Sequence, residues 1–309
     1  MLRFKGFDDE WVIKRLDEIS EINPKTRELP ENFVYIDLDS VNNGILTKFN
    51  KINKIDAPSR AQRCLDLNDI LFQTVRPYQM NNFFFELNDC DYVASTGYAQ
   101  IKSQIFPRFL YYYLHYYKFV NDVLNRCTGS SYPAINSTDL KKIKIKIPSS
   151  FNEQKLIGDL FHKIDKKIEL LENKYEYYQY FKKYLMQQIF TQKLRFNFND
   201  AWKTVKIKDI FDERSEKGFL DLELLSVTLN DGVIKRSEIE SKDNSNENKS
   251  NYKHVLPGDI VYNSMRMWQG ASGVSPYEGI VSPAYTILIP KNVYSKYFGY
   301  YFKTNEMVY

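Results

Sequence analysis

Residues 150–192 read SFNEQKLIGDLFHKIDKKIELLENKYEYYQYFKKYLMQQIFTQ, and this stretch decides the fold. Apolar side chains recur in it at alternating steps of four and three residues, with an interruption at Lys182. A period of 3.5 residues predicts one long helix with a coiled-coil seam. The seam residues are Ile157, Phe161, Ile164, Ile168, Leu171, Tyr175, Tyr178, Leu185 and Ile189.

The ends and the length of this stretch favour a spacer. Ser150 and Glu153 have the spacing of a capping box, and no proline or glycine follows Gly158 until Gly218. A helix of this length spans roughly 60 Å at about 1.5 Å per residue. The alternative, a core helix of one globular domain, predicts a shorter run with a broader apolar face.

The composition indicates a folded protein of two domains. The chain has 309 residues, of which 43% are hydrophobic, and its net charge of +4 is too small to demand a nucleic-acid partner. The three cysteines, Cys64, Cys90 and Cys127, form no CxxC pair, so we expect reduced, buried thiols. Because no signal peptide or membrane-spanning run is visible, we expect a soluble, cytoplasmic protein.

Residues 1–147 predict an α+β fold. Asn43-Gly44 indicates a tight hairpin turn, and residues 108–124, RFLYYYLHYYKFVNDVL, predict an aromatic-rich helix. A short amphipathic segment is expected over residues 11–19. The candidate strands are residues 35–38, 69–73 and 92–94.

After the long helix the pattern of the first segment returns. Matching blocks keep their order at separations of 187 to 192 residues; for example, Trp11 recurs as Trp202. The matched pairs are Leu2-Arg3-Phe4 with Leu194-Arg195-Phe196, residues 42–48 with 230–236, 69–76 with 259–266, 94–98 with 281–285, and 109–114 with 297–302. We infer a tandem repeat. The second copy lacks counterparts of residues 127–148 and of the long helix, and its insertion 241–251 is expected to be disordered.

Common catalytic motifs are absent from the sequence. No glycine is followed by lysine, so a Gly-Lys-Ser/Thr phosphate loop is missing, and we find no methyl-donor loop and no Asp/Asn-Pro-Pro-aromatic motif. His115, His162 and His254 have no repeated partner spacing. We therefore expect a protein without an active site or a metal of its own.

The segment TGSSYPAINSTDLKKIKIKIPSSFNEQKLI, residues 128–157, resembles the end of a target-recognition domain and the start of the following helix in specificity (S) subunits of type I restriction-modification enzymes. The matching residues are Gly129, Pro133, Ile135, Asp139, Leu140, Ile143, Ile145, Pro148, Glu153 and Gln154. The openings WVIKRLDEI and WKTVKIKDI and the blocks ending at Arg76 and Arg266 also resemble that family. The chain departs from the pattern because no second long helix follows its second domain.

The resemblance implies two similar target-recognition domains joined by one long coiled-coil helix. The first domain is expected at residues 1–147, the spacer helix at 148–193, and an incomplete, marginally folded second domain at 194–309. The family's function implies a non-catalytic subunit that binds a split, asymmetric site in double-stranded DNA and directs methyltransferase (M) and restriction (R) subunits to it. S-adenosylmethionine, ATP and Mg²⁺ would belong to those partners.

Candidate DNA contacts lie around the two matched blocks, because Arg pairs with guanine, and Asn and Gln with adenine. They are Arg60, Arg63, Arg76, Tyr78, Gln79, Asn81, Asn263, Arg266, Trp268 and Gln269. Lys48, Lys51, Lys54 and Lys253 are candidates for phosphate contacts. An alternative for Arg76 and Arg266 is a buried structural role, since both copies carry them. The loops after them share little beyond the arginine, so we expect the two domains to read different sequences.

Two other functions fit parts of the sequence. One is a protein-interaction scaffold that uses the seam without DNA, and the other is the specificity region of a fused restriction-methylation enzyme. Burying nine seam side chains is worth roughly 15 to 25 kcal/mol, so we expect a partner to cover them. That partner would be the same helix of a second copy, in an antiparallel homodimer, or a methyltransferase helix.

Overall fold

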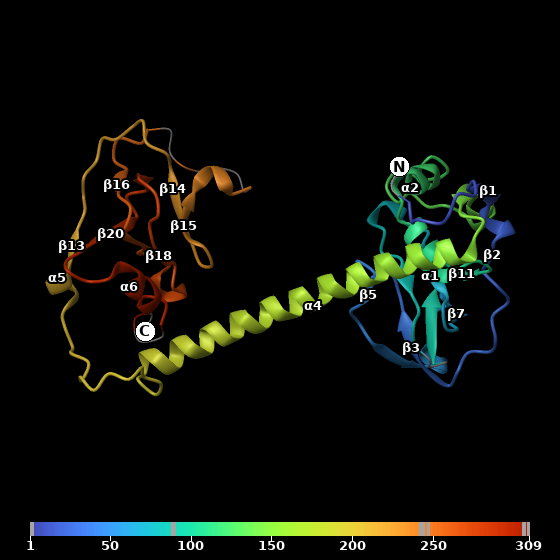
Figure 1. Cartoon of the computed structure of the whole chain (residues 1–309), viewed down its shortest axis with the longest axis horizontal. Helices are drawn as coiled ribbons and strands as arrows, with labels where there is room; N and C mark the ends of the chain where they lie inside the picture. The colour runs from blue at the N-terminus through green and yellow to red at the C-terminus, as the bar shows by residue number, and fades with distance from the viewer. Residues whose placement is uncertain (1–2, 88–90, 241–244, 246–247, 305–306, 308–309) are drawn as a thin grey trace. The chain divides into compact units, whose positions relative to one another are not determined.

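The computed structural model describes the chain except for residues 1–2, 88–90, 241–244, 246–247, 305–306 and 308–309 (Figure 1). Disorder was expected for the insertion 241–251, and six of its residues lie outside the described residues. The same holds for Leu2 and Cys90. The chain divides into two compact units, Met1–Glu172 and Asn173–Tyr309, called unit 1 and unit 2 below. The domain limits expected from the sequence, at residues 147 and 193, stay predictions.

The long helix is present as α4 (Phe151–Phe190), 40 residues without a break (Figure 1). The Ser150 hydroxyl accepts a hydrogen bond from the Glu153 amide at 3.5 Å, as expected. The Glu153 carboxylate does not reach back, however, because it accepts hydrogen bonds from Arg3 and Trp11 instead. The capping box is therefore only half formed.

Unit 1 consists mainly of short strands. Its strands are β1 (Val12–Arg15), β2 (Ser20–Ile22), β3 (Asn32–Ile36), β4 (Val41–Asn42), β5 (Ile45–Leu46), β6 (Asn50–Asn53), β7 (Ala61–Cys64), β8 (Ile70–Gln73), β9 (Phe83–Phe84), β10 (Tyr92–Ser95), β11 (Tyr98–Ser103) and β12 (Lys144–Ile147). Its helices are η1 (Leu16–Glu18), η2 (Lys54–Asp56), η3 (Pro77–Gln79), α1 (Pro107–Tyr113), α2 (Tyr117–Leu124), α3 (Ser137–Lys141) and the first part of α4.

Two four-stranded sheets, in the orders β6-β3-β10-β7 and β2-β11-β8-β9, form the centre of unit 1. Strand β8 is buried on both faces, because Ile70 and Phe72 point toward the helices while Leu71 points toward the other sheet. The expected Asn43-Gly44 turn joins β4 to β5 with both residues at positive φ. Strand β3 ends at Ile36, two residues before the expected end, because Asp37 and Ser40 form a turn.

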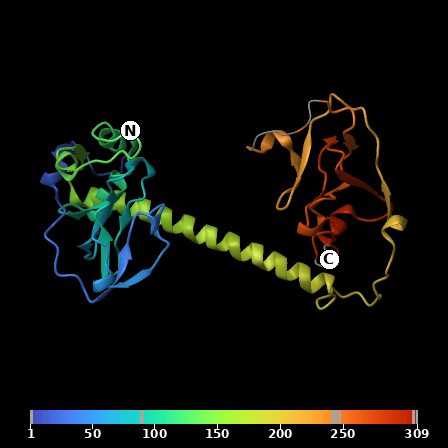
Figure 2. The same ribbon diagram turned by 180° about the vertical axis from the view of Figure 1, so that it is seen from behind.

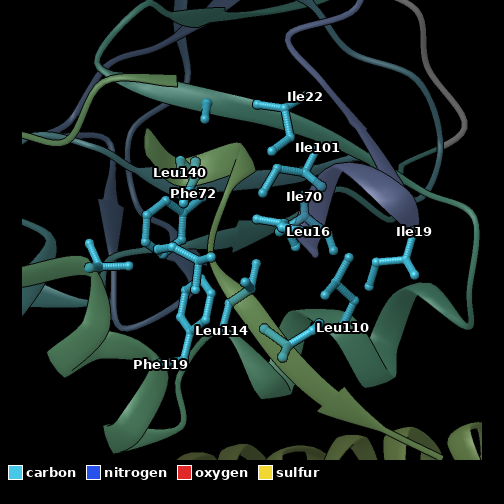
Figure 3. Close-up of a cluster of buried hydrophobic side chains, with 14 of the residues drawn as sticks. Leu16, Ile19, Ile22, Ile70, Phe72, Ile101, Leu110, Leu114, Phe119 and Leu140 are labelled. Atoms are coloured by element: carbon cyan, nitrogen blue, oxygen red, sulfur yellow. The ribbon is translucent and has the colours of Figure 1, made fainter. Parts of the chain in front are cut away.

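The helices cover the sheet that contains β8. Figure 3 shows Ile70 and Phe72 of β8 and Ile101 of β11 packed with Leu110 and Phe119 from the helical segment. Residues 108–124 do not form the single expected helix, since the chain breaks between α1 and α2. In one helix Leu114 and Phe119 would lie about 140° apart, and the break allows both to enter the same core. The expected amphipathic segment at residues 11–19 folds as β1 and η1.

Unit 2 repeats this arrangement. Its elements after α4 are α5 (Ile207–Ile210), β13 (Phe211–Glu213), β14 (Leu225–Thr228), β15 (Gly232–Lys235), η4 (Arg236–Glu238), β16 (Lys253–Val255), β17 (Ile260–Asn263), η5 (Met267–Gln269), β18 (Ser272–Val274), β19 (Gly279–Val281), β20 (Tyr285–Pro290) and α6 (Ser295–Tyr301). Figures 1 and 2 show the C-terminal end of α4 beside α6, where Phe190 packs on Tyr297 and Tyr301.

The register of the strands confirms the tandem repeat. The sheet β13-β20-β17-β18 has the same order as β2-β11-β8-β9. The pair Gln73 and Tyr98 in unit 1 corresponds to the pair Asn263 and Tyr285 in unit 2. Like β8, strand β17 is buried on both faces. Ile260 packs toward α6, while Val261 packs on the opposite face with Leu225 of β14 and Val233 of β15.

Most of the seam of α4 is uncovered. From Phe161 to Tyr178 its side chains are between 44% and 65% exposed, whereas Ile157, Leu185 and Ile189 are partly buried. Among the described residues, none of the helices is both long and apolar enough to cross a membrane. Cys64 is buried as expected, and Cys127 is half-buried.

Candidate nucleic-acid interface

A tight turn follows β8 at the edge of unit 1. Arg76 and Met80 flank the 3-10 helix η3, and both adopt left-handed backbone conformations, with φ of 55° and 52°. Such conformations are uncommon outside glycine, so the surrounding structure must hold them. The Arg76 amide donates to the Pro133 carbonyl at 2.7 Å, which ties the turn to the segment before α3.

A network of buried side-chain amides holds the turn that contains η3 by hydrogen bonds. The Gln73 side chain is 2% exposed, and its amide nitrogen donates to the Val75 carbonyl at 2.8 Å and to Gln79 Oε1 at 2.9 Å. Its oxygen accepts from the Asn81 amide at 3.1 Å. The buried Asn82 Oδ1 accepts from the Gln73 backbone amide at 2.9 Å. Because its polar atoms are paired, this network fixes the residues that the turn presents to solvent.

The Arg76 guanidinium lies over the ring of Tyr132, with its central carbon 4.3 Å from the ring centroid. Cation–π stacking orients the guanidinium while leaving its N–H groups available. Tyr132 is largely exposed, so the stacked pair is at the surface. Among the described residues, Arg76 makes no ion pair.

The turn forms one wall of a cleft of about 830 Å³. The cleft is lined by Tyr35, Asp37, Leu38, Asp39, Val41, Asn42, Thr47, Lys48, Arg60, Gln73, Val75, Arg76, Gln79, Asn81, Ser95 and Tyr132. It brings together four predicted contacts, Arg60, Arg76, Gln79 and Asn81, as well as Lys48. It also contains Gln73, Tyr132 and two aspartates that the sequence did not single out.

Other predicted contacts of unit 1 lie elsewhere. Tyr78 is exposed in η3 but does not line the cleft. Arg63 lies in strand β7 rather than in a loop; its Nε is buried without a hydrogen-bond partner, and burial lowers the pKa of the guanidinium. Lys51 is exposed in β6, whereas Lys54 donates to Glu28 at 2.6 Å.

The corresponding turn of unit 2 follows β17. Asn263 ends the strand, and its Oδ1 accepts from the Met265 amide at 3.0 Å. Arg266, Trp268 and Gln269 are exposed on η5 and its flank. The predicted phosphate contact Lys253 donates to the Tyr285 carbonyl at 2.9 Å inside unit 2.

The two turns share more than the arginine. Because η3 and η5 lie in register, Tyr78 corresponds to Trp268 and Gln79 to Gln269. The interpretation that the loops have little else in common is therefore too strong, since both present Arg-x-aromatic-Gln. The alternative of a buried pair for the arginines does not fit either, because Arg266 is exposed and Arg76 stacks at the surface.

His115 and His254 have local partners. His115 lies in the turn between α1 and α2, and burial lowers its pKa. His254 lies on β16 between Glu216 at 3.2 Å and Glu278 at 3.0 Å, and its ring stacks on Phe219. In the part of the chain that the structure describes, no three metal-ligating side chains gather at one place.

Comparison with known proteins identifies a family. A family model for the type I restriction modification DNA specificity domain matches residues 8–178, more than half of the chain. The type I restriction enzyme HindI specificity subunit of Haemophilus influenzae is 28% identical over 149 residues, which cover 45% of this chain. That match spans only 31% of the relative's length.

Solved structures share the fold. The HsdS subunit from Thermoanaerobacter tengcongensis superposes with a TM-score of 0.53 at 19% identity, covering 98% of this chain and 84% of the other. The type I restriction-modification S subunit from M. genitalium gives 0.55 at 15% identity, covering 98% and 78%. Both contain the arrangement of mixed strands and helices around a long helix. On the match of the family model, the chain belongs to the type I restriction-modification DNA specificity domain family.

Proposed function

We propose that this chain is a non-catalytic specificity subunit that recognises a split, asymmetric sequence in double-stranded DNA. In this proposal each unit reads one part of the target, and the chain directs methyltransferase and restriction subunits to it. The family assignment supports DNA recognition in general. The division of the target between the units rests on the repeat.

The observation that carries this proposal is the turn that occurs in both units at the same place in the sheet. Each turn presents an arginine, an aromatic side chain and a glutamine outside the end of the equivalent strand, β8 or β17. Arginine and glutamine offer the donor and acceptor patterns that guanine and adenine edges require. The rigid amide network under the first turn would reduce the entropy lost when these side chains bind.

The charged and polar groups around the cleft of unit 1 fit DNA, with its phosphate backbone at the rim of the cleft and base edges inside it. Lys48 and Arg60 would neutralise phosphates at its rim, while Arg76, Gln79 and Asn81, which also line the cleft, would contact base edges. The Asp37 carboxylate accepts from the Ser40 hydroxyl and the Asp39 amide, so it stabilises the local turn. The acidic groups would also disfavour phosphate at the centre of the cleft.

S-adenosylmethionine, ATP and Mg²⁺ would be used by the methyltransferase and restriction partners. We therefore expect the isolated chain to transfer no methyl group to DNA. Incorporation of labelled methyl groups from S-adenosylmethionine tests this, with the chain plus its methyltransferase subunit as the positive control. Methyl transfer by the chain alone would contradict the proposal.

The function is tested by replacing Arg76 with alanine. The variant is expected to lose about 1 to 3 kcal/mol of affinity for the target duplex if Arg76 pairs with a base. Methylation mapping with the variant complex should show one part of the recognised sequence relaxed and the other part unchanged. Arg126→Ala, which removes the same charge from another exposed position of unit 1, is the control and should leave both readouts unchanged.

The competing scaffold function makes the opposite prediction. A DNA reader loses affinity steeply as salt rises, because phosphate contacts release counterions. If the chain with its methyltransferase subunit shows no salt-dependent binding to duplex DNA, the proposed function is wrong and the scaffold is favoured.

A further inference from the structure

Two backbone groups fix the orientation of the Gln73 side-chain amide. Its nitrogen donates to the Val75 carbonyl at 2.8 Å, and its oxygen accepts from the Asn81 backbone amide at 3.1 Å. A backbone carbonyl only accepts and a backbone amide only donates, so turning the Gln73 amide over would break both bonds. The main chain therefore determines which atom of Gln73 is the nitrogen and which is the oxygen.

This orientation decides which atom of Gln79 faces inward. The Gln73 nitrogen uses its second N–H to donate to Gln79 Oε1 at 2.9 Å. Turning the Gln79 amide over would place two donors against each other beside Gln73, which is only 2% exposed. The Gln79 oxygen is therefore bound inside unit 1, and the nitrogen is the group that Gln79 offers to the cleft that both residues line.

Asn81 is held in the same way by the turn between β4 and β5. The Asn43 backbone amide, in that turn, donates to Asn81 Oδ1 at 3.1 Å. Because a backbone amide cannot accept, the Asn81 atom that it meets is the oxygen, and Nδ2 is left over. Among the described residues, neither Gln79 Nε2 nor Asn81 Nδ2 donates to a protein group.

The three polar side chains that the turn places in the cleft thus offer hydrogen-bond donors. The Arg76 guanidinium has donors and no acceptor, and the amide oxygens of Gln79 and Asn81 are already bound. In the major groove guanine presents two acceptors, N7 and O6, and thymine presents the acceptor O4. Adenine and cytosine present amino groups, which are donors. A donor that faces an amino group forms no hydrogen bond.

We propose that the turn of unit 1 selects bases that present a keto oxygen in the major groove: guanine at Arg76, and guanine or thymine at Gln79 and Asn81. The pairing of Gln79 or Asn81 with adenine, which their residue types allow, is excluded because it requires the amide oxygen. This inference rests on the proposed function and names the base chemistry that the first turn reads.

The hydrogen bonds that restrict Gln79 are not repeated in the second turn. Asn263, the counterpart of Gln73, accepts from the Met265 amide at 3.0 Å. The Gln269 side chain, the counterpart of Gln79, makes no hydrogen bond in the described part of unit 2. Its oxygen and nitrogen are both available to a base, so the restriction to keto bases applies to unit 1 alone.

Replacing Gln79 with glutamate tests the inference, because it changes the outward atom while keeping the inward one. One carboxylate oxygen still accepts from Gln73, and the other puts an acceptor where the nitrogen was. Methylation mapping of the chain with its methyltransferase subunit gives the targets of the parent and of Gln79→Glu. We expect the variant target to have the two bases of one pair exchanged, because this exchange replaces the keto oxygen by an amino group.

Binding to two duplexes that differ only by this exchange measures the preference. The parent complex should prefer its own duplex by about tenfold, and the Gln79→Glu complex should prefer the exchanged one. Comparing two duplexes within one variant cancels the general loss of affinity that the added negative charge causes. A glutamine that read adenine through its oxygen would instead keep its base pair as glutamate, since a carboxylate still accepts from the amino group.

Further variants separate this inference from the proposed function. Asn81→Asp makes the same kind of change and should also exchange one pair, whereas Gln104→Glu, at an exposed position outside the cleft, should exchange none. The inference is wrong if Gln79→Glu keeps the base pair of the parent, or if Gln104→Glu exchanges a pair as well. If Arg76→Ala relaxes the target in these cases, the proposed function stands. If Arg76→Ala also leaves the target unchanged, the proposed reading of DNA by this turn fails too.

Discussion

Glu153 shows how one residue joins distant parts of unit 1. Its carboxylate accepts from Arg3, 150 positions earlier in the chain, and from Trp11. The hydrogen bonds from Arg3, followed by the smaller contribution from Trp11, hold the pKa of Glu153 below its ordinary value against the opposing effect of burial. Sequence spacing suggested only a local partner for this glutamate, because a capping box is visible in four residues and a partner 150 residues away is not.

The lowered pKa of Glu153 makes the stability of unit 1 depend on pH. Because the folded-state pKa of Glu153 is lowered, its contribution to stability is complete above its ordinary pKa of 4.5 and disappears as pH falls through the lowered value. We expect Glu153→Gln to lose about 1 to 3 kcal/mol of stability around β12 at pH 7. The difference from the parent should shrink below pH 4.5.

Hydrogen exchange of peptides covering β1 and β12 measures this effect locally. Glu172→Gln, a change of the same kind at an exposed position of α4, is the control. If the parent and Glu153→Gln exchange equally fast in this region at pH 7, the ion pair does not hold the segment.

At the scale of elements, the features that could be predicted from the sequence are those with a periodic, characteristic or repeated residue pattern. The long helix followed from the spacing of its apolar residues, the Asn43-Gly44 turn from its residue types, and the two matched strand blocks from the repeat. The break between α1 and α2 could not be predicted in this way, because it depends on where Leu114 and Phe119 meet the core. The cleft was only partly predicted, since Tyr132 comes from a segment that joins the turn of Arg76 through tertiary contacts.

At Gly158 helix α4 lies in close contact with the start of α1. A Cβ atom there would lie 2.8 Å from the Phe109 nitrogen and 2.9 Å from the Phe106 ring. Alanine normally stabilises a helix by about 1 kcal/mol relative to glycine. We nevertheless expect Gly158→Ala to lower the free energy of unfolding of unit 1 by about 1 to 3 kcal/mol, because the two helices must separate.

Urea unfolding of unit 1, followed by exchange protection of β8 and β11, checks this prediction. Asn173→Ala on an exposed face of α4 should be neutral or stabilising and serves as the control. A Gly158→Ala variant as stable as the parent would mean that the close approach of α4 and α1 adapts without cost.

At the scale of the whole molecule, the uncovered seam calls for a partner. Six consecutive seam residues from Phe161 to Tyr178 remain about half exposed or more, although their spacing is that of a coiled coil. A continuous apolar stripe of this kind is rarely left in water. The homodimer and the methyltransferase helix both stay predictions, as does the marginal stability of the second domain.

We expect the chain alone to form a dimer through this seam, with two α4 helices antiparallel across a two-fold axis. Ile164→Glu combined with Leu171→Glu places four carboxylates in such an interface, where burial of unpaired charge is costly. The double variant should therefore be monomeric by light scattering at concentrations at which the parent is dimeric. Asn173→Glu combined with Gln179→Glu adds the same charge outside the seam and should leave the dimer intact. A monomeric parent chain, or a dimer that survives the seam substitutions, would contradict this prediction.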